Sequence, residues 1–347
     1  MPMAWGLSFY KEDSMKKLLT TILAVVLCAF SVLATSCREP EKDKINFKYY
    51  ANPAGIVKIF GQEESIGLIP EPAATNLTNK IKKQGGNVYR LDLQELYDAE
   101  EKAYPQAVLM VKKSVLGANP SIVQVLEEKI SESVSWVKTN PTTAVEAIGK
   151  RGVTTLTANT LTPDVVDACK IYWQSAENAK TSVKNYVNGI IEIDATKASN
   201  VDDDFFYTNS NLSGEKGEYL FVMPDGAPAI ATAKLMNDSD SLSTGKTVDY
   251  KVVVADMIRA HLTAGTADFI LAPVNLASKF YKTFDSNDHY VMVSVVTHGN
   301  FYILSTEEIA LSDLCGKQIA VPMMGAVPDW TLQMVLKKHG LSFAVVE

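Results

Sequence analysis

The segment GKQIAVPMMGAVPDWTLQMVLKKHGL, residues 316–341, predicts a strand, a tight loop and a helix in succession. The apolar run from Gln318 to Met323 is typical of a buried strand. Pro328 is expected in the first turn of the helix, and Gly340 just past its end. The first N–H groups of a helix have no partner within it. Because ligands of open α/β sheets bind at such helix starts, the segment predicts an α/β fold with a binding edge.

The same order of elements recurs elsewhere in the chain. VMPDGAPAIATAKLM, residues 222–236, repeats the strand, the Gly-Ala pair, the proline and the helix. HLTAGTADFILAPVNLA, residues 261–277, parallels KIFGQEESIGLIPEPAA, residues 58–74, since each passes from a helix through glycine into an apolar strand and a proline. Two halves built from similar units predict two lobes that face one ligand-binding cleft.

The bulk composition excludes several classes of protein. The 347 residues suffice for one large or two medium domains, and the hydrophobic content of 47% supports a well-formed core. A formal net charge of −7 argues against nucleic-acid binding, which needs a basic surface. The four cysteines and four histidines show neither CxxC spacing nor paired histidines. We therefore expect no metal site, no disulfide framework and no cofactor.

Residues 1–37 are expected to be a targeting segment. From Met15 the chain reads MKKLLTTILAVVLCAFSVLATSC, with basic residues, an apolar run and small residues before Cys37. This resembles a bacterial lipoprotein signal, which implies a lipid (palmitate) anchor on Cys37, although Ala34 stands where leucine is usual. The alternative is an uncleaved membrane anchor. Both alternatives place the rest of the chain outside the cytoplasm, on the periplasmic side.

The remaining chain divides by composition. Residues 38–44 form a polar tether, and residues 45–207 form an α/β region followed by helices. The helix starts are Asn119-Pro120, Asn140-Pro141 and Thr162-Pro163. Residues 208–218 are a polar linker, and residues 219–347 form another α/β region.

Short motifs spread over both regions resemble a known family. Residues 217–341 are similar to the first lobe of periplasmic solute-binding proteins of the sulfonate, nitrate and thiamine-precursor type, which have the type II fold. The motifs of that lobe are Gly226-Ala227-Pro228, Ala264 to Pro273, Asp313 to Lys317, Gly325 to Trp330 and Gly340-Leu341. Residues 45–207 resemble the second lobe, through Leu68 to Pro72, Asn119-Pro120, Trp136 to Pro141 and Asp202 to Tyr207.

The two lobes stand in reversed order along this chain. In the family the lobe ending in a Gly-Leu helix comes first, whereas here it ends at Glu347 and the segment that should follow begins near Lys44. The resemblance therefore implies a circularly permuted α/β, type II, two-lobed binding-protein fold. The alternative is a reading frame that was cut and rejoined. Permutation is physically tolerable where the old termini lie at the surface and can be bridged.

The resemblance also implies a function. It predicts the monomeric, lipid-anchored solute-binding component of an ABC importer, which delivers a small anionic or heteroaromatic solute to a membrane permease. An enzyme of the same fold, acting in thiamine-pyrimidine or menaquinone synthesis, is one alternative. A non-binding lipoprotein left by rearrangement is another. A catalytic role needs His, Cys or acidic residues concentrated at one site, and the four scattered histidines indicate none.

The candidate ligand-binding residues stand at strand ends and helix starts, with no catalytic residue among them. Asp225 either caps its helix or selects an amine, and Glu71 either meets a cation or accepts loop N–H groups. Trp330 either covers an apolar ligand or packs in the core. His298 either hydrogen-bonds the solute or is a structural histidine, and Asn300 is a further possible hydrogen-bonding group. The full set is Glu71, Asp225, Gly226, Ala227, Pro228, Pro273, Thr297, His298, Gly325, Ala326, Val327 and Trp330.

Overall fold

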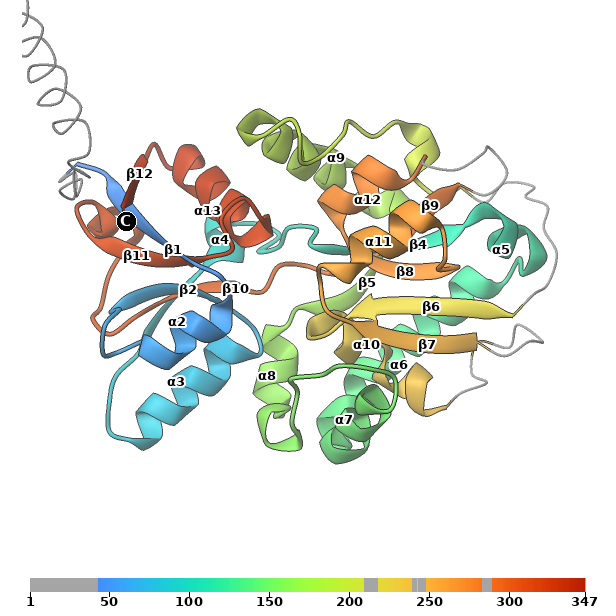
Figure 1. Cartoon of the computed structure of the whole chain (residues 1–347), viewed down its shortest axis with the longest axis horizontal. Coiled ribbons are helices and arrows are strands. Elements are labelled where there is room, and N and C mark those ends of the chain that lie inside the picture. Colours follow the sequence, from blue (N-terminus) through green and yellow to red (C-terminus); the bar gives the residue numbers. More distant parts are fainter. Residues whose placement is uncertain (1–42, 209–217, 239–241, 243–247, 283–288, 347) are drawn as a thin grey trace, which may run out of the picture. The chain divides into compact units, whose positions relative to one another are not determined.

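The computed structural model contains two six-stranded sheets. It describes residues 43–208, 218–238, 242, 248–282 and 289–346. Their strand orders can be followed in Figure 1. Sheet 1 runs β12 (Phe343–Val346), β1 (Ile45–Tyr50), β11 (Gln318–Pro322), β2 (Ile66–Pro70), β10 (Phe301–Ser305) and β3 (Tyr89–Asp92). Sheet 2 runs β5 (Ile171–Ser175), β9 (Tyr290–Thr297), β4 (Ala107–Lys112), β8 (Phe269–Pro273), β6 (Tyr219–Pro224) and β7 (Val248–Val253).

The two sheets share one arrangement of strands. In sheet 1, β11 is parallel to both β1 and β2, and β10 is antiparallel to β2. In sheet 2, β6 is parallel to both β7 and β8, and β4 is antiparallel to β8. In each sheet three neighbouring strands are parallel, and the middle strand of the three is β11 in sheet 1 and β6 in sheet 2. These two strands belong to the two segments that the sequence identified as repeats. The structure thus confirms the α/β class and the repeated strand–helix units.

Helices cover both faces of each sheet (Figure 1). Those near sheet 1 are α2 (Pro53–Ile59), α3 (Ala73–Lys83), α4 (Leu93–Tyr97) and α13 (Val327–Lys338). Those near sheet 2 are α5 (Lys113–Ala118), α6 (Ile122–Thr139), α7 (Pro141–Gly149), α8 (Pro163–Ala168), α9 (Ala176–Ile193), α10 (Ala227–Asn237), α11 (Met257–Ala264) and α12 (Val274–Phe280). Short 3₁₀ turns are η1 (Ala158–Thr160), η2 (Asp203–Phe205) and η3 (Leu311–Leu314).

Local sequence explains where these elements begin and end. Proline stands in the first turn of α10 and of α13, where its missing N–H is not needed. Helix α11 ends at Gly265, whose φ of 59° is the left-handed conformation that glycine adopts without strain. Helix α10 is buried on nearly all sides, since α6 and α7 pack against it. Its Ala-rich sequence provides the small side chains that such close packing requires.

The predicted division into residues 45–207 and 219–347 does not follow the sheets. The first range supplies β1, β2 and β3 to sheet 1 but β4 and β5 to sheet 2. The second range supplies β6 to β9 to sheet 2 and β10 to β12 to sheet 1. An apolar run shows that a strand is buried but not which sheet it joins. Both sheets belong to one compact unit, Pro40–Val345.

Several predicted segments fall outside the described residues. They are the signal segment with Cys37, most of the 38–44 tether and most of the 208–218 linker. The second unit, Met1–Glu39 with Val346–Glu347, contributes only Val346 to the described part. Among the helices that the structure describes, none combines the length and the apolar character needed to cross a membrane.

Candidate functional site

Four of the predicted site residues lie along one edge of sheet 2. Asp225 follows β6, Pro273 ends β8, and Thr297 and His298 stand at the end of β9. Strand β4 lies between β8 and β9, and its Ala107 pairs with both Pro273 and Thr297. This is the carboxyl edge of the parallel strands, where ligands of open α/β sheets bind.

Glu71 lies at the corresponding edge of sheet 1, immediately after β2, and its carboxylate is fully engaged. The Thr75 N–H donates to Oε2 at 3.0 Å and the Thr75 hydroxyl donates to Oε1 at 2.7 Å. The Arg90 guanidinium donates to Oε1 at 2.6 Å, and the Glu71 side chain is completely buried. Of the two readings left open, the structure favours loop stabilisation, since the cation that Glu71 meets is internal to the protein.

The loop before α13 has its own internal carboxylate, which sequence reasoning missed. Asp329 is 2% exposed and accepts hydrogen bonds from the Tyr49 hydroxyl at 2.9 Å and the Gln333 amide at 2.7 Å. It also accepts from the Gly325 N–H at 2.8 Å. Burial, reinforced by this carboxylate, raises the pKa of Tyr49. Negative charge is favourable at a helix N-terminus. The signal was present, because acidic residues are common in the first turn.

The other candidates of this loop have structural surroundings. Gly325 has a φ of 67°, the left-handed region that favours glycine. Ala326 is the N-cap residue of α13 and Val327 is its first residue, with no side-chain cap. Trp330 is only 4% exposed and belongs to the core, so core packing rather than ligand covering is its role in this structure.

Asp225 is likewise engaged, at the start of α10. Its carboxylate accepts from the Thr154 hydroxyl, the Thr155 hydroxyl and the Thr155 N–H, each at 2.8 Å. It therefore holds a neighbouring loop, and it neither caps α10 nor stands free to select an amine. Gly226 supplies the tight turn with a φ of 93°, and Ala227 is 3% exposed. The remaining candidate, Pro228, lies in the first turn of α10.

Thr297 and Asn300 hold the crossing segments between the sheets together. The Thr297 hydroxyl accepts from the Ala107 N–H at 3.0 Å and donates to the Gln106 Oε1 at 3.4 Å. The Gln106 amide donates to Asn300 Oδ1 at 2.9 Å, and the Asn300 amide donates to the Glu71 carbonyl at 3.4 Å. Both residues were expected to bind solute, but their polar atoms are used in this chain of hydrogen bonds.

His298 differs from all these residues. It is 2% exposed, and neither Nδ1 nor Nε2 has a hydrogen-bond partner among the described residues. Burial lowers the pKa of His298 to about 3; the Lys170 carbonyl opposes this effect, although its geometry does not form a hydrogen bond with the ring. The ring is therefore neutral at physiological pH, with one donor and one acceptor nitrogen. Buried polar groups are rarely left unpaired, so this ring requires an explanation.

Tyr172 covers the His298 ring. The two rings stack with centroids 3.5 Å apart and planes 7° from parallel, and Tyr172 remains 43% exposed. Tyr172 lies on the edge strand β5, whose pairing with β9 is irregular between Ile171 and Gln174. Such irregularities re-aim side chains and are common next to active sites. Sequence reasoning missed β5, although Ile171, Tyr172 and Trp173 are residues that favour strands.

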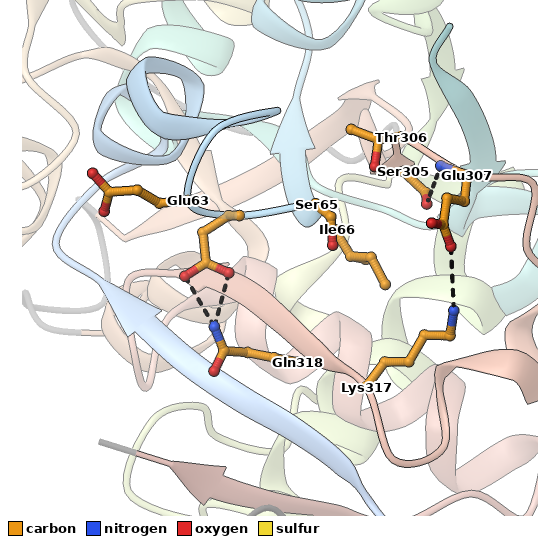
Figure 2. Close-up of a pocket in the computed structure, with 9 residues that line it drawn as sticks. Glu63, Ser65, Ile66, Ser305, Thr306, Glu307, Lys317 and Gln318 are labelled. Atoms are coloured by element: carbon orange, nitrogen blue, oxygen red, sulfur yellow. Dashed lines mark hydrogen bonds and ion pairs between the residues drawn. The ribbon is translucent and has the colours of Figure 1, made fainter.

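A pocket of about 310 Å³ lies at the opposite, amino edge of sheet 1 (Figure 2). Its buried acid, Glu64, already accepts from Lys48 at 2.9 Å, Tyr50 at 2.6 Å and Gln318 at 2.9 Å. The opposite wall of the pocket carries Glu307, whose Oε2 lies 3.8 Å from the Nζ of Lys317. None of the predicted site residues lines this pocket, so it is separate from the edge that holds His298. The lining residues are Glu63, Glu64, Ser65, Ile66, Ser305, Thr306, Glu307, Lys317 and Gln318.

Metal-ligand groups and thiols are further kinds of functional group to compare with the candidate residues. No group of three or more His, Cys, Asp or Glu side chains within the described ranges could hold a metal ion. Cys169 and Cys315 are free thiols, of which Cys169 is buried and Cys315 is exposed. Burial raises the pKa of the Cys169 thiol, which keeps it protonated. His298 is thus the one candidate residue whose side-chain polar atoms are buried and unpaired in the described part.

Comparison with known proteins adds little to this geometry. No family model matches the chain, and no curated protein matches it. One similar solved structure is the crystal structure of NikA from Brucella suis in complex with Fe(III)-EDTA, with a TM-score of 0.31 and 9% sequence identity. The match covers 75% of this chain and 57% of that chain. At this level the likeness carries no argument, so the α/β class rests on the two sheets themselves.

Proposed function

We propose that this chain is the solute-binding component of an ABC importer, and that it captures a small solute at the carboxyl edge of sheet 2. The observation that carries the proposal is His298, a buried imidazole with two unpaired nitrogens at the edge where ligands of open α/β sheets bind. An unpaired buried group is unfavourable until something completes its hydrogen bonds. A bound solute would do so.

The duplicated sheet pattern and the family-like motifs support the same proposal. Each sheet places a central parallel strand before a Gly-Ala loop and a helix, as the resemblance to solute-binding proteins implies. The proposal includes lipidation of Cys37, an extracytoplasmic location on the periplasmic side and a membrane permease as partner. These three parts come from the resemblance and the signal-like segment, because Cys37 lies outside the described residues.

The reversed order of the halves is also part of the proposal. Strands β12 and β1, from the two ends of the described chain, are neighbours in sheet 1. The Ile45 N–H donates to the Ser342 carbonyl at 3.0 Å. Chain ends that lie side by side in one sheet are what a circular permutation requires, since the old connection can be cut there while the sheet is kept.

Capture rather than catalysis suits the surroundings of His298. A general base needs its imidazole within hydrogen-bond reach of a nucleophile or an orienting acid. Neither ring nitrogen has a partner of any kind among the described residues. The two candidate acids, Glu71 and Asp225, are engaged in loop contacts. We therefore propose that the chain is not an enzyme.

The test is a thermal unfolding screen of the full chain against sulfonates, nitrate, amines, dicarboxylates and uncharged polar compounds. A solute present at 100 times its dissociation constant adds about 2.7 kcal/mol to the free energy of unfolding. We expect one class to raise the melting temperature of the wild type. We expect His298→Phe, which removes both nitrogens, to abolish that shift.

His339→Phe is the matched control, because His339 is exposed and its Nε2 lies 2.9 Å from the Leu96 carbonyl. It should respond to the solute as the wild type does. A solute that shifts the wild type and His298→Phe equally would move the binding site elsewhere. A wild type that no class shifts would contradict the proposed function.

A further inference from the structure

We infer that His298 and Tyr172 together recognise an uncharged polar group, so that the solute is neutral at the end that enters this site. The inference rests on the proposed function and adds the chemical class of the solute. It narrows the expectation drawn from the sequence, which included anionic solutes bound at free helix N-termini.

The first support is that three carboxylates and one guanidinium at the two edges are already engaged within the protein. Glu71 and Arg90 form a salt bridge of 2.6 Å. Asp225 is bonded to two threonines, and Asp329 occupies the loop at the N-terminus of α13. An ionic solute would lose its hydration without meeting a free counter-charge from these residues, which is strongly unfavourable.

The second support is the His298 ring itself. No neighbouring charged side chain contributes to its pKa shift; burial accounts for the lowering, and the only other influence is the Lys170 carbonyl. The neutral ring offers one donor and one acceptor. A carboxamide or a hydroxyl can satisfy either nitrogen, whereas a carboxylate can accept from the donor nitrogen but offers nothing to the acceptor.

The third support is the position of Tyr172. It explains how a solute reaches the ring of His298, which is only 2% exposed. Tyr172 is the outer, half-exposed member of the stack, and it lies in the irregular part of the edge strand β5. The sheet ladder does not hold it between Ile171 and Gln174. We therefore assign Tyr172 as the movable cover, which lifts to admit the solute and then packs on it.

The decisive experiment uses matched compounds that differ in charge alone. Acetamide, acetate and acetamidinium form one series, and benzamide, benzoate and benzamidinium form another. Binding to the full chain is measured by ligand-observed NMR at millimolar concentration and pH 7.5. We expect the uncharged member of at least one series to bind at least tenfold more tightly than either ion, and we expect His298→Phe to lose that binding.

Variants inside and outside the site separate recognition from structure. Tyr172→Ala removes the stacked ring and should weaken binding about tenfold, while His339→Phe, at an exposed histidine outside the site, should bind as the wild type does. An ion that binds as tightly as its uncharged analogue, with loss in His298→Phe, would overturn this inference and leave the proposed function standing. If no uncharged compound binds, the inference fails; if none of the six binds, the proposed function loses its support as well.

Discussion

The carboxyl edges of the two sheets have the same strand pattern but differ in how their polar groups are satisfied. In sheet 1, Glu71 and Asp329 are buried and each carboxylate accepts three hydrogen bonds. In sheet 2, His298 is equally buried, and its ring forms no hydrogen bond with the described residues. A buried polar group without a partner costs about 1–3 kcal/mol, whereas a complete network stabilises the fold. This difference is the basis of our proposal that the solute binds at the second edge.

The repeated segments show how the difference arose in the sequence. Aligning residues 58–74 with 261–277 places Glu71 opposite Val274, and aligning the two proline-started helices places Asp329 opposite Ala229. Val274 and Ala229 are completely buried. Sheet 2 thus has apolar side chains at both positions where sheet 1 has a carboxylate. Its edge lacks these two networks. Asp225 and Thr297 are engaged there, while the His298 ring has no hydrogen-bond partner among the described residues.

The largest effect is expected for Glu71→Ala, which removes the centre of the sheet 1 network. The Arg90 guanidinium and Thr75 would lose their partner, and leaving a largely buried charge unpaired costs about 3 kcal/mol or more. Urea unfolding at pH 7.5 measures this loss of stability. The control is Glu95→Ala, which breaks the exposed Glu95–Lys102 pair of 2.8 Å and should change stability little. Equal losses in the two variants would refute a special role for Glu71.

A smaller effect is expected for Asp329→Ala, which gives α13 the residue found at the same place in α10. Tyr49, Gln333 and the Gly325 N–H would lose their acceptor, so we expect a loss of about 2 kcal/mol. Asp225→Ala, at the half-exposed loop of sheet 2, should lose only about 1 kcal/mol. Urea unfolding of the two variants compares the stability that each loop contributes. A larger loss in Asp225→Ala than in Asp329→Ala would show that the loop of sheet 2 contributes more stability than the loop of sheet 1.

Much of the fold was predictable because its signals are local. Apolar runs bounded by glycine and proline located β2, β6, β8 and β11, and the Pro and Gly punctuation located α10, α11 and α13. Strands β3 and β5 and helix α4 were missed, because each is short and lacks a full period of hydrophobic residues. The mixing of both halves in each sheet was also missed, since strand pairing is a long-range property.

The site was predictable in place but not in role. Sequence reasoning located the strand ends where Asp225, Glu71 and His298 stand, because prolines and glycines mark them. It could not show that Asp225 and Glu71 are held by Thr155 and Arg90, residues 70 and 19 positions away. The pairing of His298 with Tyr172 was equally hidden. Whether a polar side chain is free depends on distant partners, and one sequence does not reveal them.

An effect smaller than that of Glu71→Ala sharpens the comparison through pH. The folded pKa of His298, about 3, lies below its ordinary value of 6.5 because burial disfavours the charged ring. The unfolded chain therefore takes up this proton first, and stability from the neutral ring is complete above pH 6.5 and declines as pH falls toward 3. We expect a loss of about 1–2 kcal/mol between pH 6.5 and 5, measured by urea unfolding of the wild type. His298→Phe should lack this component, while His339→Phe should retain it. Identical pH slopes in all three proteins would mean that His298 is solvated in the folded state, and the contrast between the two edges would disappear.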